Sequence, residues 1–351
     1  MLANIDSLEV EKRKRHAVAK IITHTKEPTQ SAATGFAPAN IALCKYWGKR
    51  DTVLNLPLTS SLSISLGTKG TSTKISLREG NDSIELNGQI CAANDPFAVR
   101  LSSFLDLFRP RSAFGFKICT HNTIPTSAGL ASSASGFAAL VTALDQLFSW
   151  QLEKRALSIL ARLGSGSASR SVYTGFVEWH AGSADDGSDS YAQELETTWP
   201  ELRLGLLTLS AEKKAWDSRS AMQHTQATSP FYSEWPRMIQ ADLATIKEAI
   251  ENRNFEQLGQ ASESNALALH ALILSARPSI LYWKPETLDI LHRIEQLRRK
   301  GLAIYATIDA GPNIKLIFLE SATEDVRTYF PEVEIIVPFA ATAKTSLPLP
   351  V

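Results

Sequence analysis

The hydrophobic pattern of the chain changes near Pro200, and this change limits the folds that are open to it. Before Pro200, residues 58–67 and 71–80 alternate apolar and polar side chains, which is the pattern of half-buried strands. After it, apolar residues recur at helical spacing over 233–252, 254–274 and 285–299. The sequence therefore predicts an α+β protein with two domains and a cleft between them, and 351 residues suffice for both.

Shorter elements complete this division. Asn87-Gly88 predicts a tight hairpin, and helices are expected over 96–108, 132–150 and 153–163. In the second half we expect strands over 203–209, 302–309, 313–319 and 333–339, with a helix over 321–330. The predicted boundaries are a charged extension over 1–33, a first domain over 34–200 and a second over 201–351.

Composition excludes some classes of protein. Lys and Arg total 36, as do Asp and Glu, so no net charge favours binding to nucleic acid or to an anionic membrane. No apolar run approaches the ~18 residues of a membrane span, and the N-terminus lacks the apolar core of a secretory signal. Three scattered cysteines fit a reducing compartment better than a disulfide framework, so we expect a cytoplasmic protein.

Residues 122–144 run from turn residues through small residues into an apolar helix. A helix N-terminus leaves N–H groups unpaired and attracts anions, a phosphate above all. Small residues would let a phosphate approach the backbone and serines would add hydroxyls: Gly129, Ala131, Ser132, Ser133 and Ser135. The stretch is not a Walker P-loop. A small-residue helix packed closely against a neighbour explains it about as well.

Two further stretches favour anions. Ser165-Gly166-Ser167 offers hydroxyls and accessible amides, and Arg170 follows one helical turn later, where its guanidinium could bind the same anion. The alternative is an N-cap beside a surface arginine. In residues 44–50, Lys45, Lys49 and Arg50 are interleaved with Tyr46 and Trp47. The alternative is that these cations lie on an edge strand and prevent it from pairing with other chains. That would explain a single lysine better than it explains the whole cluster.

A carboxylate ends an apolar strand in the stretch YATIDAGPNIKLI. Asp309 is followed by Ala-Gly-Pro-Asn and then by the next strand. Catalytic groups often lie at such strand ends, but aspartates also initiate turns in any protein. On this stretch alone the turn is the better interpretation.

Taken together and in this order, these stretches resemble the GHMP kinase superfamily and, within it, the mevalonate diphosphate decarboxylases. The resemblance covers about residues 36–340, and KYWGKRD together with DAGPN is specific to the decarboxylases. It implies a GHMP kinase-like fold: an N-terminal domain similar to ribosomal protein S5 domain 2, a ferredoxin-like C-terminal domain and an active site between them.

The resemblance also implies a reaction and its groups. Members convert mevalonate 5-diphosphate and ATP, with Mg²⁺, into isopentenyl diphosphate, ADP, phosphate and CO2. Asp309 matches the catalytic aspartate, which orients the C3 hydroxyl and accepts or steers its proton, and Lys45 supports the region around it. Arg170 matches the arginine that holds the carboxylate or diphosphate end of the substrate. The matches to substrate-binding residues are Tyr46, Lys49, Ser165, Gly166, Ser167 and Ser190. The small-residue stretch from Gly129 to Ser135 would cradle ATP, with Ser133 as a contact to phosphate or Mg²⁺.

Three alternatives remain at this stage. A relative could use mevalonate 5-phosphate, although Lys49 and Arg170 beside the serines favour the diphosphate. Another could stop at 3-phosphorylation, although such kinases lack the pairing of Asp309 with Lys45. A non-catalytic protein that binds nucleotide or isoprenoid intermediates would be expected to have a broken site. The resemblance further implies a homodimer, with no nucleic-acid or membrane partner.

Overall fold

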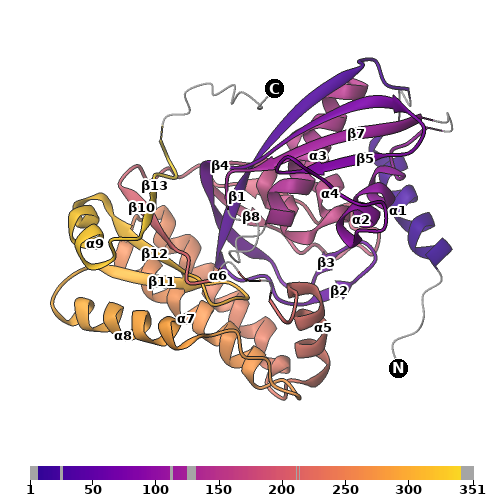
Figure 1. Cartoon of the computed structure of the whole chain (residues 1–351). Helices are drawn as coiled ribbons and strands as arrows, with labels where there is room; N and C mark the ends of the chain where they lie inside the picture. The colour runs from indigo at the N-terminus through magenta and orange to yellow at the C-terminus, as the bar shows by residue number, and fades with distance from the viewer. Residues whose placement is uncertain are drawn as a thin grey trace.

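The computed structural model describes residues 7–23, 27–110, 114–124, 132–210, 212 and 214–340. It has two lobes, each built on a β-sheet, and their helices pack on these sheets (Figure 1). The elements of the first half are α1 (Ser7–Ile21), β1 (Ala32–Cys44), β2 (Lys49–Asp51), β3 (Leu56–Pro57), β4 (Ser61–Glu79), β5 (Ser83–Leu86), β6 (Gln89–Ile90), α2 (Pro96–Leu105), β7 (Phe114–Asn122), α3 (Ser132–Phe148), α4 (Lys154–Gly164), the 3₁₀ helix η1 (Gly166–Val172), β8 (Phe176–Trp179) and β9 (Ala192–Glu194).

The second half holds fewer strands and longer helices, as the sequence pattern predicted. Its elements are β10 (Leu202–Leu207), α5 (Ser218–Thr228), η2 (Tyr232–Glu234), α6 (Trp235–Glu251), α7 (Phe255–Leu274), α8 (Pro285–Arg299), β11 (Ile304–Ile308), β12 (Ile314–Leu319), η3 (Glu320–Ala322), α9 (Thr323–Tyr329) and β13 (Glu334–Ile336). The predicted helices and strands of this half are confirmed. Helix α5 is an addition that the sequence analysis did not predict.

Strand β4 organises the first sheet. It pairs antiparallel with β1 along one side, with β8 along the first half of its other side and with β7 along the second half. The two alternating stretches of the sequence are therefore one long strand. The predicted hairpin at Asn87-Gly88 is also confirmed, since both residues have positive φ (52° and 81°) between β5 and β6.

Helix α3 lies unusually close to β1. A Cβ atom on Gly35 of β1 would meet the Ala139 carbonyl oxygen of α3 at 2.2 Å. Ala138, Ala139 and Ala143 are almost completely buried. The small residues of this helix are therefore explained in part by close packing, which was the plainer interpretation of the stretch.

Alternate residues of the second sheet face different helices. The sheet has the order β11-β12-β10-β13. Ile314, Leu316 and Phe318 of β12 pack in a cluster with α8 and α9, whereas Ile317 packs with α6, α7 and β1. Since side chains alternate along a strand, Lys315 points toward the same side as Ile317. A lysine is thus buried in the region where the two lobes meet.

One hydrophobic cluster joins the two lobes. It combines Ile41 of β1, Ile64 of β4 and Phe176 of β8 with Leu204 of β10 and Ile246 of α6. The mutual position of the lobes is therefore fixed by apolar packing. A boundary between two units near residue 200 remains our prediction.

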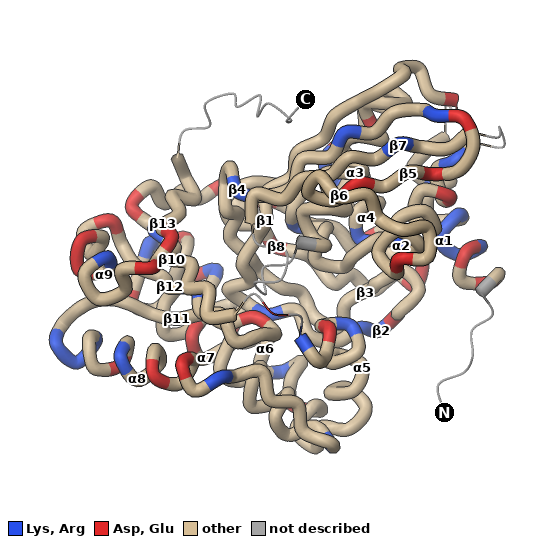
Figure 2. Tube along the Cα trace, in the orientation of Figure 1, with Lys and Arg blue, Asp and Glu red and all other residues tan. Residues whose placement is uncertain are grey.

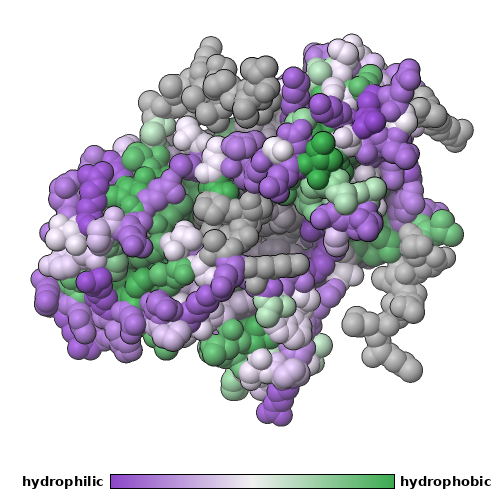
Figure 3. Space-filling model, in the orientation of Figure 1, coloured by the Kyte–Doolittle hydropathy of each residue, from purple (hydrophilic) through white to green (hydrophobic). Residues whose placement is uncertain are grey.

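The N-terminal segment is more than a charged tail. Ala17, Val18 and Ile22 are buried in the core of the first lobe. Figure 1 shows α1 beside α2 and α4. In the part of the chain that the structure describes, no helix is long and apolar enough to cross a membrane. Figure 2 shows Lys and Arg interspersed with Asp and Glu along both lobes. Hydrophilic residues cover most of the face shown in Figure 3, and hydrophobic ones gather in separate patches.

Candidate active site

A cavity of about 430 Å³ lies where β1, η1, α5 and the turn after β11 meet. Most of the side chains singled out in the sequence line it: Lys45, Tyr46, Lys49, Ser133, Ser165, Gly166, Ser167, Arg170 and Asp309. Further lining residues were not named as candidates in the sequence analysis: Asn40, Asn55, Arg100, Lys214, Asp217 and Arg219. The fold thus assembles the separate motifs into one site.

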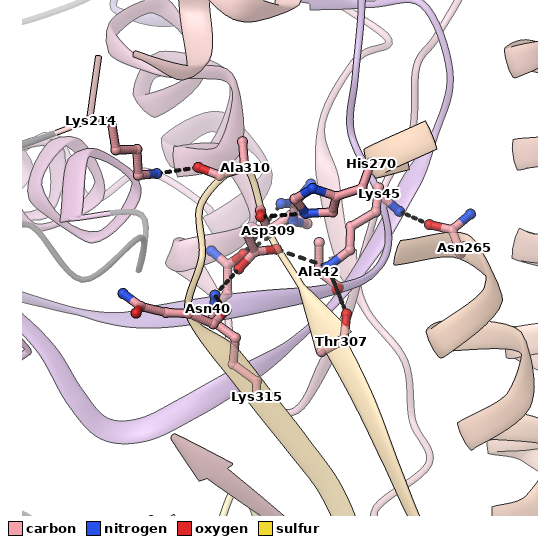
Figure 4. A network of polar contacts seen from close by, with 12 residues as sticks. Asn40, Ala42, Lys45, Lys214, Asn265, His270, Thr307, Asp309, Ala310 and Lys315 are labelled. Atoms are coloured by element: carbon pink, nitrogen blue, oxygen red, sulfur yellow. Dashed lines mark hydrogen bonds and ion pairs between the residues drawn. The ribbon is translucent and has the colours of Figure 1, made fainter. Parts of the chain in front are cut away.

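Two lysines hold Asp309. Its Oδ1 lies 2.9 Å from Nζ of Lys45, and its Oδ2 lies 3.0 Å from Nζ of Lys315. The lysine side chains are 2% and 3% exposed, whereas that of Asp309 is 25% exposed. The carboxylate therefore keeps an open edge toward the cavity while its charge is compensated from behind (Figure 4).

This arrangement keeps Asp309 ionised. Burial alone would raise the pKa of its carboxyl, but the ammonium groups of Lys315 and Lys45 outweigh burial and hold the pKa well below its usual range. The pKa of Lys45 is lowered, by burial first, and Asp309 opposes that shift. Lys45 Nζ also donates to Ala42 O at 2.8 Å and to Thr307 Oγ1 at 2.7 Å, so all three of its protons have acceptors.

Helix α7 positions the backbone on both sides of this ion cluster. Oδ1 of Asn265 accepts a hydrogen bond from the backbone N–H of Lys45 at 2.8 Å. Nε2 of His270 lies 3.0 Å from the backbone oxygen of Asp309 (Figure 4). Burial lowers the pKa of His270 to about 4, so the ring is neutral and donates Nε2–H to this carbonyl. Lys214 donates to the next carbonyl, that of Ala310.

Arg170 is a buried cation with neutral partners. Only 3% of the residue is exposed, and its guanidinium donates to Ser61 Oγ at 2.5 Å and to Asn40 Oδ1 at 3.3 Å. Burial lowers its pKa to about 10, so it remains charged at neutral pH. Within the described residues, no carboxylate forms an ion pair with it. A buried guanidinium in this position is suited to an anionic ligand.

Tyr46, Gly166 and Trp179 form one tightly packed wall. The rings of Tyr46 and Trp179 lie edge to face with centroids 4.8 Å apart. A Cβ atom on Gly166 would lie 2.8 Å from Trp179 Cη2 and 2.9 Å from the Tyr46 hydroxyl oxygen. This hydroxyl is buried and has no hydrogen-bond partner among the described residues. It borders the cavity, so a ligand there could satisfy it.

One predicted substrate contact lies behind this wall. Ser190 is completely buried and is not among the described residues that line the cavity. Trp179 Nε1 donates a hydrogen bond to Ser190 Oγ at 3.2 Å. The Ser190 hydroxyl in turn donates to the backbone oxygen of His180 at 3.0 Å. The structure thus places Ser190 where it orients Trp179.

Positive charge concentrates at the Lys49 end of the cavity. The ammonium of Lys49 donates a hydrogen bond to Oδ1 of Asn55 at 2.7 Å. The amide of Asn55 is held in place because its Nδ2 donates to the backbone oxygens of Arg162 and Leu163. Burial, followed by the charges of Arg219 and Arg100, lowers the pKa of Lys49 to about 7. Like charges held close together indicate a site for a multiply charged anion.

The residues predicted to bind the nucleotide do not all face the cavity. Ser133, in the first turn of α3, lies with its Oγ 3.3 Å from Ser165 Oγ, which is 3.4 Å from Ser167 Oγ. Ser135 instead faces the sheet and shares a 2.7 Å hydrogen bond with Thr71. Ser132 begins α3, and Gly129 and Ala131 lie outside the described residues.

These hydroxyls, the helix N-terminus and the cations fit the phosphates of a nucleotide. No group of three or more His, Cys, Asp or Glu in the described part of the chain could hold a metal. Mg²⁺ is usually held by phosphate oxygens, water and one or two protein side chains.

Two matches to family models account for most of the chain. Residues 37–192 match the "diphosphomevalonate decarboxylase-like N-terminal domain" and residues 206–345 the "mevalonate 5-diphosphate decarboxylase C-terminal domain". A diphosphomevalonate decarboxylase from Aspergillus fumigatus is 38% identical over 325 residues, which are 86% of this chain and 80% of the relative.

Solved structures agree with this match. The mevalonate diphosphate decarboxylase of Staphylococcus aureus superimposes with a TM-score of 0.83 at 35% identity, over 89% of this chain and 96% of that one. A complex of MDDEF with MVAPP, AMPPCP and magnesium gives a TM-score of 0.80 at 34% identity, over 87% and 96%. The GHMP kinase-like fold expected from the sequence is therefore confirmed, and this chain belongs to the diphosphomevalonate decarboxylase family.

Proposed function

We propose that this chain is an enzyme that converts mevalonate 5-diphosphate and ATP into isopentenyl diphosphate, ADP, phosphate and CO2. The observation that carries the proposal is the ionised carboxylate of Asp309, held by two buried lysines with its open edge in a cationic cavity. In this proposal the carboxylate faces the C3 hydroxyl of the substrate, and the cations neutralise the negative charges of the substrate.

The cavity offers each part of this substrate a partner of matching charge. We assign the diphosphate to Lys49, Tyr46 and the hydroxyls of Ser165 and Ser167. Arg170 is near enough to Asp309 for the two charges to interact, so a substrate carboxylate bound to its guanidinium would bring the adjacent C3 hydroxyl toward Asp309. The substrate is then held at both ends, which orients the reacting carbon.

The low pKa of Asp309 defines its role. A carboxylate that is so reluctant to bind a proton is a weak base, but it is a good acceptor for the hydrogen bond of a hydroxyl. Phosphoryl transfer depends mainly on positioning and on charge neutralisation. We therefore assign Asp309 to orienting the C3 hydroxyl toward the γ-phosphate of ATP. As the hydroxyl oxygen bonds to the γ-phosphorus, the bond to ADP breaks and the hydroxyl proton passes to an oxygen of the transferred phosphoryl group. The phosphorylated oxygen is then a good leaving group.

The second half of the reaction uses the same groups. Departure of phosphate from C3 develops positive charge on that carbon, next to the negative charge of Asp309, which stabilises it. The electrons of the C–CO2 bond then form the double bond of the product, and CO2 leaves. Lys45 and Lys315 keep Asp309 fixed throughout, because their own hydrogen bonds are made within the protein.

Ser133 at the N-terminus of α3 is our candidate for a contact to the phosphates of ATP or to Mg²⁺. Mg²⁺ would neutralise phosphate charge as the phosphoryl group moves. The related MDDEF structure contains AMPPCP and magnesium together with MVAPP. Gly129, Ala131 and Ser132 complete this proposal, whereas the buried Ser135 would support the helix from below.

The assembly and the compartment are also proposals. The resemblance to the family suggests a homodimer, which light scattering after size-exclusion chromatography would measure. Cys44, Cys91 and Cys119 are free thiols, which suits a reducing compartment such as the cytoplasm.

An end-point assay with ATP and Mg²⁺ tests the proposed reaction. Mevalonate 5-diphosphate and mevalonate 5-phosphate would be supplied in parallel, and ADP and CO2 would be measured together. The proposal predicts equal amounts of ADP and CO2 from the diphosphate. CO2 from the monophosphate alone would instead assign the chain to a related decarboxylase. ADP without CO2 would make it a 3-kinase, and no turnover would support a binding protein.

A further inference from the structure

Helix α1 carries a lysine in the middle of its packed face. Val10, Ala17, Val18 and Ile21 lie three, four or seven positions from Lys14, so all five share one side of the helix. These apolar residues pack into the core of the first lobe. Lysine is rarely placed on such a face unless its ammonium reaches a partner or water beyond it.

Ion pairs fix α1 beside the cationic end of the cavity. Arg13 Nη2 lies 2.6 Å from Asp51 Oδ2 of β2, two residues after Lys49. Farther along the helix, Lys20 Nζ lies 2.7 Å from Asp186 Oδ2. The residue next to Arg13 is therefore held near the strand that carries Lys49.

Lys14 faces positive groups and no negative partner. Among the described residues, no carboxylate lies within ion-pair distance of its ammonium. Its pKa is lowered to about 8, by burial and then by the charges of Arg219 and Arg100, both of which line the cavity. Lys49 in turn is affected by the charge of Lys14. Lys49, Arg100 and Arg219 line the cavity, whereas Lys14 is not among its described lining residues and lies on α1 next to Arg13, which is paired with Asp51 of β2.

The neighbouring carboxylates are already engaged. Asp51 binds Arg13 and accepts the backbone N–H of Leu54 at 2.8 Å. Asp217 caps α5 by accepting from the backbone N–H groups of Arg219 and Ser220. Such a concentration of cations is costly without an anion, and the proposed substrate supplies one with up to three negative charges on its diphosphate.

From this geometry we infer that Lys14 is a specificity-determining residue that helps to bind the terminal phosphate of the substrate diphosphate. The inference rests on the proposed function and extends it to a helix that precedes both family-matched ranges. In this chain the side chain of Lys14 would then reach the diphosphate from just outside the residues that line the cavity. A substrate with a single phosphate would leave Lys14 without a partner.

The test compares Lys14→Met with Lys14→Arg and with Lys12→Met. Lys12 is exposed on the same helix, so its variant removes the same charge away from the cavity. Lys14→Met should raise the KM for mevalonate 5-diphosphate by about tenfold, the size of one charge-assisted hydrogen bond, with kcat and the KM for ATP within twofold of wild type. Lys14→Arg should retain most of the affinity, and Lys12→Met all of it.

Calorimetric titration with inorganic pyrophosphate provides a readout that is independent of turnover. Lys14→Met should weaken the Kd by the same factor. If wild type did not turn over mevalonate 5-diphosphate, the proposed reaction would fail, and the pyrophosphate Kd would still decide the role of Lys14.

The inference is overturned if Lys14→Met and Lys12→Met bind pyrophosphate equally well, or if only the KM for ATP rises. Thermal unfolding without ligand checks that the variants fold. Lys14→Met should unfold at the same temperature as wild type or higher, because it relieves repulsion among like charges. Lys14→Gln is a second variant that removes the positive charge, and it replaces Lys14→Met if that variant does not fold.

Discussion

Nζ of Lys45 lies 2.9 Å from Oδ1 of Asp309, although the two residues are 264 positions apart in the chain. Lys45 directly follows β1 of the first sheet, and Asp309 directly follows β11 of the second. Their ion pair thus spans the two lobes beneath the cavity. Any movement of one lobe against the other would disturb the carboxylate that we propose as catalytic, so the shared hydrophobic cluster would serve the proposed chemistry as well as stability.

Replacing Lys315 should change the pH dependence of the enzyme. Its ammonium is the larger of the two charges that hold the pKa of Asp309 down, after the opposing effect of burial. In Lys315→Met this pKa rises, so loss of activity on the acid side should begin at a higher pH than in wild type. We also expect kcat to fall by about tenfold or more.

The measurement is kcat from pH 4 to pH 8. Lys117→Met is the matched control, because Lys117 is an exposed lysine on strand β7. An acid limb of the Lys315→Met profile at the same pH as that of wild type would argue that Lys315 does not act on Asp309.

His270 should make stability depend on pH. Its folded-state pKa of about 4 lies below the ordinary value of 6.5, so its contribution is complete above pH 6.5 and is lost as the pH falls toward 4. Between pH 7 and pH 5, wild type should lose about 2 kcal/mol of unfolding free energy through this residue.

In His270→Gln this part of the pH dependence should disappear, which urea unfolding at several pH values would measure. His121→Gln, at an exposed histidine of β7, should keep the slope of wild type. Equal slopes for His270→Gln and wild type would contradict the assignment.

Gly166→Ala should disturb substrate binding through Tyr46. The new Cβ would lie within 3.0 Å of both Trp179 and the Tyr46 hydroxyl, and the two rings already pack against each other. We expect a destabilisation of about 1–3 kcal/mol and a higher KM for mevalonate 5-diphosphate.

Thermal unfolding and steady-state kinetics test this expectation. Gly136→Ala is the control, since a Cβ on Gly136 of α3 would meet no atom within 4 Å and alanine favours a helix. A Gly166→Ala variant that matched Gly136→Ala in both measurements would show that the wall is not tightly packed.

Local sequence patterns predicted most elements, whereas the roles of the site residues came from the resemblance to the family. Alternation marked the two halves of β4, and the cluster around Lys45 lines the cavity as expected. Asp309 lines it too, although its stretch alone favoured a turn. Lys315 was missed as a site residue, although a lysine inside an otherwise apolar strand is a visible signal of a buried partner.

Other residues could not be found from local patterns. Lys14, Arg100 and Arg219 lie on three helices far apart in sequence, and each is an ordinary cation on an amphipathic segment. Only the tertiary fold brings their charges together. Helix α5 was missed because its sequence has few apolar residues, although Asp217 before it is a typical N-cap. The sequence pattern alone also did not separate Ser133, which lines the cavity, from Ser135, which is buried, because only the tertiary fold decides which face of α3 meets the sheet.

We propose that Asp309 serves both phosphorylation and decarboxylation at C3. The most direct test is the simultaneous measurement of ADP and CO2 from mevalonate 5-diphosphate by wild type and Asp309→Asn, with folding checked by thermal unfolding. We expect equal amounts of ADP and CO2 from wild type, and a loss of both by the same factor of about 10³ or more in the variant. An Asp309→Asn protein that still formed ADP at the rate of wild type would contradict it.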